Sequence, residues 1–144
     1  MRVANDILIP ELERLLAQGK EVRFTPSGNS MRPFIEGDCD SVILAPLTRE
    51  PRRGDVVLAQ LANNAYVLHR IIRIAYPAII LQGDGNLSGE EQCTADHIIG
   101  RVIAIEKPNG HRKPLTRGQL WYALRPIRRY LLKIYRHTLL KMYQ

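Results

Sequence analysis

The spacing of apolar residues changes twice along the chain. Near the N-terminus they recur at three- and four-residue steps and Gly19 follows, which predicts an amphipathic helix over residues 7–18. From Glu21 the period falls to two, which predicts a short strand leading into a loop at residues 25–29. The pattern therefore predicts one N-terminal helix followed by β structure.

Short apolar runs, separated by glycine, aspartate and asparagine, fill the middle of the chain. They predict strands at Ser41–Ala45, 55–61, 66–74, 79–82 and Ile98–Glu106. The pair Asn63-Asn64 predicts a turn that joins the second and third of these strands into a hairpin. Short strands with such turns indicate a mostly β, antiparallel fold rather than an alternating β–α fold.

The helical period returns at the C-terminus. Apolar residues recur every three or four positions from Leu115, with arginine and lysine between them, and Pro126 kinks this helix or starts a new one. We therefore divide the chain into a β-rich domain over residues 1–106, a linker over 107–114 and a basic amphipathic helical tail over 115–144.

Composition narrows the class of protein. A length of 144 residues with 45% hydrophobic and 24% charged residues fits one globular domain and excludes a second large domain and wholesale disorder. The two cysteines form no CxxC motif, and no two of the four histidines lie at metal-ligand spacing. We expect no disulfide framework, no metal and no cofactor.

The net charge of +7 comes from the linker and the tail. Residues 1–106 hold 11 Lys/Arg and 14 Asp/Glu, whereas residues 107–144 hold 10 Lys/Arg and no acidic residue. Such a helix suits an anionic membrane surface; the alternative is that its apolar stripe packs on the β domain. Nucleic acid is not an expected partner, because no DNA- or RNA-binding motif accompanies the charge. The sequence shows no secretory signal and no transmembrane segment, so the expected location is the cytoplasm, with the tail at the inner membrane face.

One stretch suggests catalysis. Ser30 follows a glycine-containing loop and precedes a predicted turn over residues 30–36, an arrangement that can expose a hydroxyl beside backbone N–H groups able to bind an oxyanion. Alone the motif is weak, because serine after Gly-Asn is more often a cap or turn residue. The whole stretch reads Gly28-Asn29-Ser30-Met31-Arg32-Pro33.

Four further motifs follow in order. They are Gly54-Asp55-Val56-Val57, His69-Arg70, Gly83-Asp84-Gly85-Asn86 and Gly100-Arg101-Val102. Together with the serine stretch, this series resembles the type I signal peptidase and LexA-like serine protease superfamily over about residues 25–106. The resemblance implies a β-rich peptidase domain with Ser30 as nucleophile, Met31 and Pro33 beside the substrate pocket, and an oxyanion loop formed by Gly28, Asn29 and Ser30.

The position before Arg70 departs from most of that superfamily, which has a lysine base there. This chain has His69, which resembles the endoplasmic-reticulum type of signal peptidase and implies a Ser/His dyad. A histidine base usually needs a third group to orient it. The resemblance favours Asp84 for that role on motif position, and Asp96 and Glu90 stay open as alternatives. The simpler interpretation is that His69 is a sheet residue and that Asp84 makes local turn bonds.

The resulting functional hypothesis is a serine endopeptidase that cleaves leader or precursor peptides. One alternative is a non-catalytic binding module whose basic tail contacts anionic lipid or nucleic acid. The other is a self-processing regulatory protein of the LexA-like type, although no LexA-type scissile pair precedes Ser30.

Overall fold

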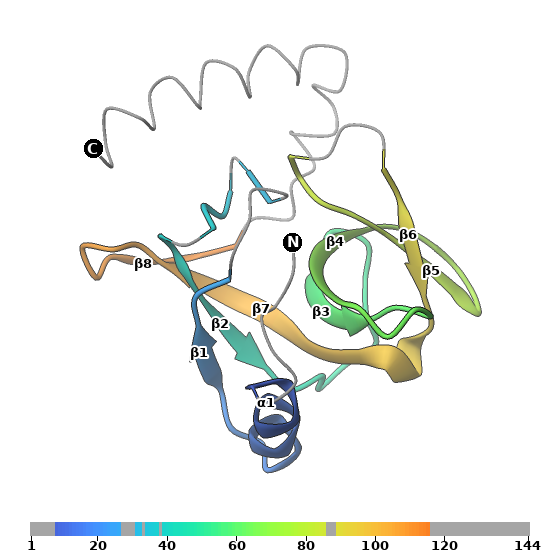
Figure 1. Ribbon diagram of the computed structural model, residues 1–144, viewed down its shortest axis with the longest axis horizontal. Helices are drawn as coiled ribbons and strands as arrows, with labels where there is room; N and C mark the ends of the chain where they lie inside the picture. Colours follow the sequence, from blue (N-terminus) through green and yellow to red (C-terminus); the bar gives the residue numbers. More distant parts are fainter. Residues whose placement is uncertain (1–7, 27–30, 33, 38, 86–88, 116–144) are drawn as a thin grey trace.

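The computed structural model describes residues 8–26, 31–32, 34–37, 39–85 and 89–115. This part of the chain is mostly β, with one short helix near the N-terminus, which confirms the predicted class (Figure 1). Its elements are α1 (Leu8–Ala17), β1 (Val22–Phe24), β2 (Ser41–Ala45), β3 (Val56–Gln60), β4 (Tyr66–Ala75), β5 (Ala78–Gln82), β6 (Glu91–Cys93), the 3-10 turn η1 (Ala95–His97), β7 (Ile98–Glu106) and β8 (Arg112–Pro114). The predicted helix of the tail lies outside the described residues.

All eight described strands belong to one antiparallel sheet. Its order is β1-β2-β7-β3-β4-β5-β6, and β8 pairs with β7. The hairpin predicted around Asn63-Asn64 is confirmed, because β3 pairs with β4 and Asn64 adopts a left-handed φ of 65°. Strand β7 comes late in the sequence but lies between β2 and β3, so it joins the two parts of the sheet.

The predicted linker of residues 107–114 is partly a strand. Lys107 donates its backbone N–H to the carbonyl of His111, and Gly110 closes the turn with a φ of 87°. Arg112–Pro114 then pairs with the end of β7. Its three side chains are exposed, so no alternation of apolar residues marked it as a strand.

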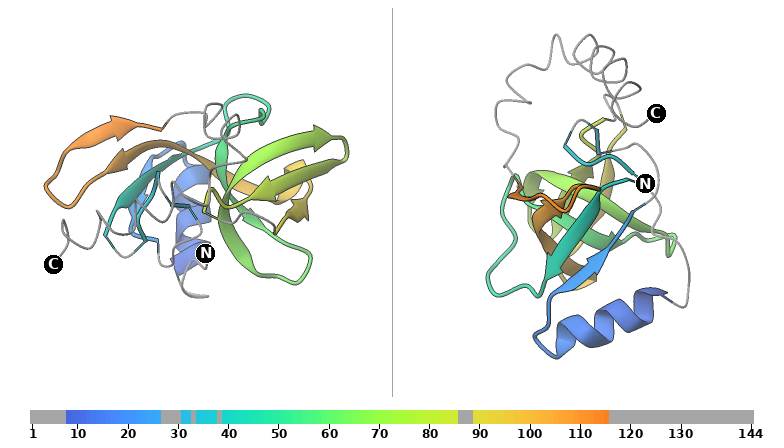
Figure 2. Two further views of the ribbon diagram at one scale, coloured as in Figure 1. Left: turned by 90° about the horizontal axis from the view of Figure 1, so that it is seen from above. Right: turned by 90° about the vertical axis from the view of Figure 1, so that its left-hand side faces the viewer.

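The sheet curves strongly. The register shifts at one point in each of three strand pairings, β2 with β7, β3 with β7 and β4 with β5, and such bulges bend and twist strands. Seen from above, the β7–β8 hairpin extends to one side of the molecule and the β4–β5 hairpin to the other (Figure 2). The short strand β6, which was not predicted, pairs with β5.

Apolar residues fill both faces of the central strands. On β3, Val56 and Leu58 belong to a first core that also contains α1, whereas Val57 and Ala59 belong to a second core lined by β4 and β5. Side chains alternate between the faces of a strand, so adjacent residues of β3 and β4 enter different cores. No helix among the described residues has the length and apolar character needed to cross a membrane.

Helix α1 ends where the sequence predicts. Gly19 has a φ of 81° and donates its N–H to Leu16, while Lys20 donates to Leu15, which is the Schellman arrangement that a glycine favours. The buried face of the helix then packs against β7 at Gly100. A Cβ at Gly100 would lie 3.0 Å from Leu16 Cδ1 and 3.1 Å from the carbonyl oxygen of Ala45.

Gly100→Ala is therefore expected to destabilise the fold by about 1–3 kcal/mol, the usual cost of overpacking a core. Urea unfolding measures the loss. In a Leu16→Ala background the added methyl group gains space, so the same substitution should cost less there than in the parent. Equal costs in the two backgrounds would show that the helix does not constrain Gly100.

Candidate active site

The structure describes part of the predicted site. Ser30, together with Gly28, Asn29 and Pro33, lies outside the described residues, and its proposed role stays a prediction. Met31, His69 and Asp84 are described, and all three are buried. The site can therefore be built from the segment that follows Ser30, from strand β4 and from the segments that contact them.

The segment of residues 31–40 joins the predicted nucleophile to β2. Phe34 and Ile35 donate their backbone N–H groups to the carbonyl of Met31, so the segment begins with a tight turn, as the sequence predicted for residues 30–36. The side chain of Met31 lies in the first core, and its Sδ accepts the backbone N–H of Asp84 at 3.4 Å. The residue that follows Ser30 is thus held beside the loop after β5.

Arg70 is the charged group at the centre of this region, and its residue is fully buried. Its Nε and Nη2 donate to the two carboxylate oxygens of Asp84 at 2.8 Å each, and its Nη1 donates to the carbonyl of Gly54 at 2.8 Å. The guanidinium also lies 5.1 Å from the ring centroid of Phe34, within the range of a cation–π contact. Arg70 therefore binds together β4, the start of β3, the loop after β5 and the segment after Ser30.

His69, the neighbour of Arg70, has a different partner. Its Nδ1 lies 2.6 Å from a carboxylate oxygen of Glu91, which is on β6. The His69 side chain is 3% exposed and that of Glu91 is 25% exposed. A carboxylate accepts hydrogen bonds, so this contact assigns the proton of the neutral ring to Nδ1 and makes Nε2 its basic nitrogen.

The strand register explains why the two carboxylates have different partners. His69 lies on the face of β4 that carries Val67 and Ile71 of the second core, whereas Arg70 lies on the opposite face with Leu68. The orienting role predicted for Asp84 stays a prediction, but both oxygens of its carboxylate are engaged by Arg70.

Glu91, the carboxylate that contacts His69, was not among the predicted site residues. Glu90 and Asp96, the two predicted alternatives to Asp84, also lie elsewhere. Glu90 is exposed and pairs with Arg73 at 3.6 Å, and Asp96 is an exposed residue that lines a cavity beside α1.

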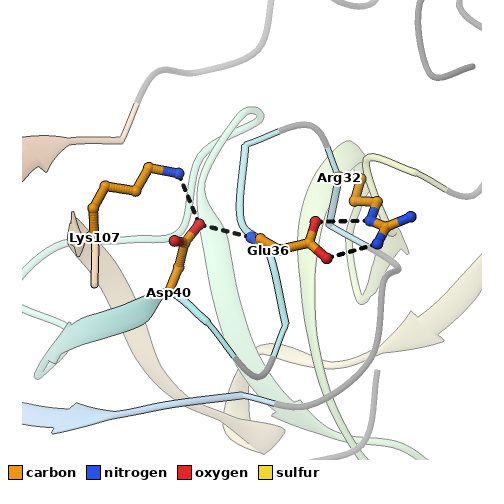
Figure 3. A network of polar contacts seen from close by, with 4 residues as sticks. All are labelled: Arg32, Glu36, Asp40 and Lys107. Atoms are coloured by element: carbon orange, nitrogen blue, oxygen red, sulfur yellow. Dashed lines mark hydrogen bonds and ion pairs between the residues drawn. The ribbon is translucent and has the colours of Figure 1, made fainter. Parts of the chain in front are cut away.

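A second polar network lies along the segment after Ser30 (Figure 3). Arg32 donates from Nε and Nη2 to the carboxylate of Glu36 at 2.7 and 2.6 Å. Asp40 Oδ2 accepts both the backbone N–H of Glu36 and the Nζ of Lys107, each at 2.8 Å. Two buried carboxylates thus each receive a cation, and one of these cations comes from the end of β7.

Other reactive groups near the site have structural explanations. Burial, with a contribution from the charge of Asp96, raises the pKa of the Cys93 thiol to about 11, so Cys93 stays protonated at neutral pH. Asp55 closes its turn by accepting the N–H of Arg52 and pairs with Arg49. Among the described residues, no group of three or more His, Cys, Asp or Glu side chains is arranged to hold a metal ion.

Comparisons with known proteins assign neither a family nor a function to the chain. No protein-family model matches the chain, and no curated protein matches its sequence.

The two carboxylates are expected to differ in their effect on stability. Asp84→Asn leaves the buried charge of Arg70 without its anion, so the free energy of unfolding should fall by about 3–5 kcal/mol. Glu91→Gln, at a partly exposed position, should cost about 1 kcal/mol or less. Urea unfolding of both variants measures the difference. Equal losses would contradict the difference drawn between the fully buried pair at Arg70 and the partly exposed pair at His69.

Proposed function

We propose that the protein is a serine endopeptidase of the signal peptidase and LexA-like type. In this proposal Ser30 is the nucleophile, His69 is the general base and Glu91 is the carboxylate that orients His69. Glu91 takes the place that the sequence resemblance gave to Asp84. The contact between His69 Nδ1 and Glu91 is the observation that carries the proposal, because it gives a buried histidine a fixed tautomer and orientation.

The surroundings of His69 support this assignment in two ways. A buried histidine needs a hydrogen-bond partner in any role, and a carboxylate at 2.6 Å is the partner that can also stabilise an imidazolium. In addition, Met31, Asp84 and Arg70 form a continuous series of contacts from the residue after Ser30 to the residue after His69. This series ties the nucleophile segment to the strand that carries the base.

The proposed mechanism follows ordinary acyl transfer. The Ser30 hydroxyl attacks the scissile carbonyl while Nε2 of His69 takes its proton, and Glu91 stabilises the imidazolium that forms. His69 then gives the proton to the leaving amine, and water hydrolyses the acyl-enzyme by the same route. Backbone N–H groups of the loop at residues 28–30 are proposed to bind the oxyanion. The substrate class proposed is a leader or precursor peptide.

A serine-reactive fluorophosphonate probe tests the catalytic residues. Ser30→Ala should abolish labelling, since it removes the attacking oxygen. His69→Ala and Glu91→Gln should each lower the labelling rate by about 10²- to 10⁴-fold, because they remove the base and its orienting group.

Glu90→Gln is the matched control, because Glu90 is the neighbouring residue and its exposed carboxylate contacts Arg73 instead. Its labelling rate should equal that of the parent. Unchanged labelling of Ser30→Ala would overturn the proposed nucleophile. Equal effects of Glu90→Gln and Glu91→Gln would overturn the proposed role of Glu91.

We also propose an anionic membrane surface as a partner of the tail. The support is the charge pattern of residues 115–144, seven basic residues with no acidic one, interleaved with apolar and aromatic residues. Each basic residue near such a surface contributes about 1 kcal/mol.

Replacement of Arg125, Arg128 and Arg129 by glutamine should therefore weaken binding to anionic vesicles by about 100-fold. Sedimentation with phosphatidylserine-containing vesicles measures the binding, and phosphatidylcholine vesicles give the neutral reference. Replacement of the exposed arginines 52, 53 and 73 controls for charge outside the tail. Equal losses in the two triple variants, or no binding by the parent at low salt, would contradict the proposal.

A further inference from the structure

The segment after Ser30 has little regular structure of its own. Its described backbone bonds form two isolated turns, one closed on the carbonyl of Met31 and one in which Cys39 and Asp40 donate to the carbonyl of Glu36. The described residues of the segment form no helix or strand, so contacts with the rest of the fold help to fix its position.

Contacts at both ends hold this segment. At its start, the Met31 side chain lies in the first core and accepts the N–H of Asp84. At its end, the fully buried carboxylate of Asp40 accepts Lys107 Nζ at 2.8 Å (Figure 3). The pair between Arg32 and Glu36 spans only one turn, so it shapes the segment without fixing its position on the sheet.

The backbone of Lys107 is fixed by the sheet, so its side chain can hold Asp40 in place. Lys107 directly follows β7, the strand between β2 and β3, and its backbone N–H and carbonyl both bond within the turn to β8. Its side chain is only 20% exposed. The pair therefore connects residues 67 positions apart, and the same Asp40 oxygen fixes the backbone N–H of Glu36 at 2.8 Å.

We propose that Asp40 and Lys107 are positioning residues for the nucleophile. Their ion pair fixes the end of the segment against β7, and this contact, together with that of Met31, sets the position of Ser30. The inference rests on the proposed role of Ser30. Misplacement of a reacting group by about 1 Å can lower a rate about 100-fold, so a lost anchor has a measurable effect even where the fold persists.

Labelling by the fluorophosphonate probe and hydrogen exchange at the Glu36 amide test the proposal together. Lys107→Met should lower the labelling rate about 10- to 100-fold and speed exchange of the Glu36 N–H. Lys107→Arg, which keeps the charge, should restore most of the labelling rate. Lys113→Met is the matched control, because Lys113 is an exposed residue of the neighbouring strand β8, and it should change neither readout.

A double-variant cycle tests whether the two residues act as a pair. Asp40→Asn and the combined Asp40→Asn/Lys107→Met variant should label at about the rate of Lys107→Met alone, because each removes the same interaction. Melting temperatures identify any variant that unfolds. If Lys107→Met unfolds, Lys107→Gln is used in its place.

Two results overturn the proposal. One is labelling of Lys107→Met at the parent rate, and the other is a rate loss in Lys107→Met that Lys107→Arg does not restore. Absence of Ser30-dependent labelling in the parent protein refutes the proposed function instead. In that case the Glu36 exchange rate still decides whether the pair fixes the segment: faster exchange in Lys107→Met supports this, and unchanged exchange overturns it.

Discussion

The buried ion pair of Arg70 and Asp84 is the interaction on which the rest of the described structure depends. A charge removed from water is tolerated only with a full set of partners, and the guanidinium of Arg70 finds them in Asp84, the carbonyl of Gly54 and the ring of Phe34. These partners belong to three segments that are distant in sequence. Burial of one cation thus imposes a common geometry on the start of β3, the loop after β5 and the segment after Ser30.

Strand β4 separates two kinds of polar contact by the alternation of its side chains. Arg70 faces the first core and holds segments together, while its neighbour His69 faces the second core and contacts Glu91. Arg70 and His69 are therefore adjacent in sequence, but each contacts its own carboxylate and they do not compete for one. In the proposed enzyme, the base gains its rigidity from the strand that Arg70 anchors.

The fold was more predictable from the sequence than the site. Strands β2, β3, β4 and β7 were predicted because their apolar runs are bounded by turn residues, and the end of α1 because Gly19 favours a left-handed φ. The sequence did not reveal β8, whose side chains are all exposed. Glu91 was not among the predicted residues because β6 was not predicted, and only the pairing of β6 with β5 brings this carboxylate to His69. The contact of Asp40 with Lys107 belongs to no motif, since only the sheet brings these residues together.

The position of β7 has a consequence for how the protein is synthesised. Strand β7 is the pairing partner of both β2 and β3, yet among the described strands only β8 leaves the ribosome after it. Until it emerges, β2 and β3 each have an unpaired edge. Such edges promote aggregation unless a chaperone covers them or the sheet is completed quickly. Lys107 emerges directly afterwards, so the segment after Ser30 gains its second anchor only when the sheet is complete. In the proposed peptidase, the active geometry could therefore form only after β7 and Lys107 have been synthesised.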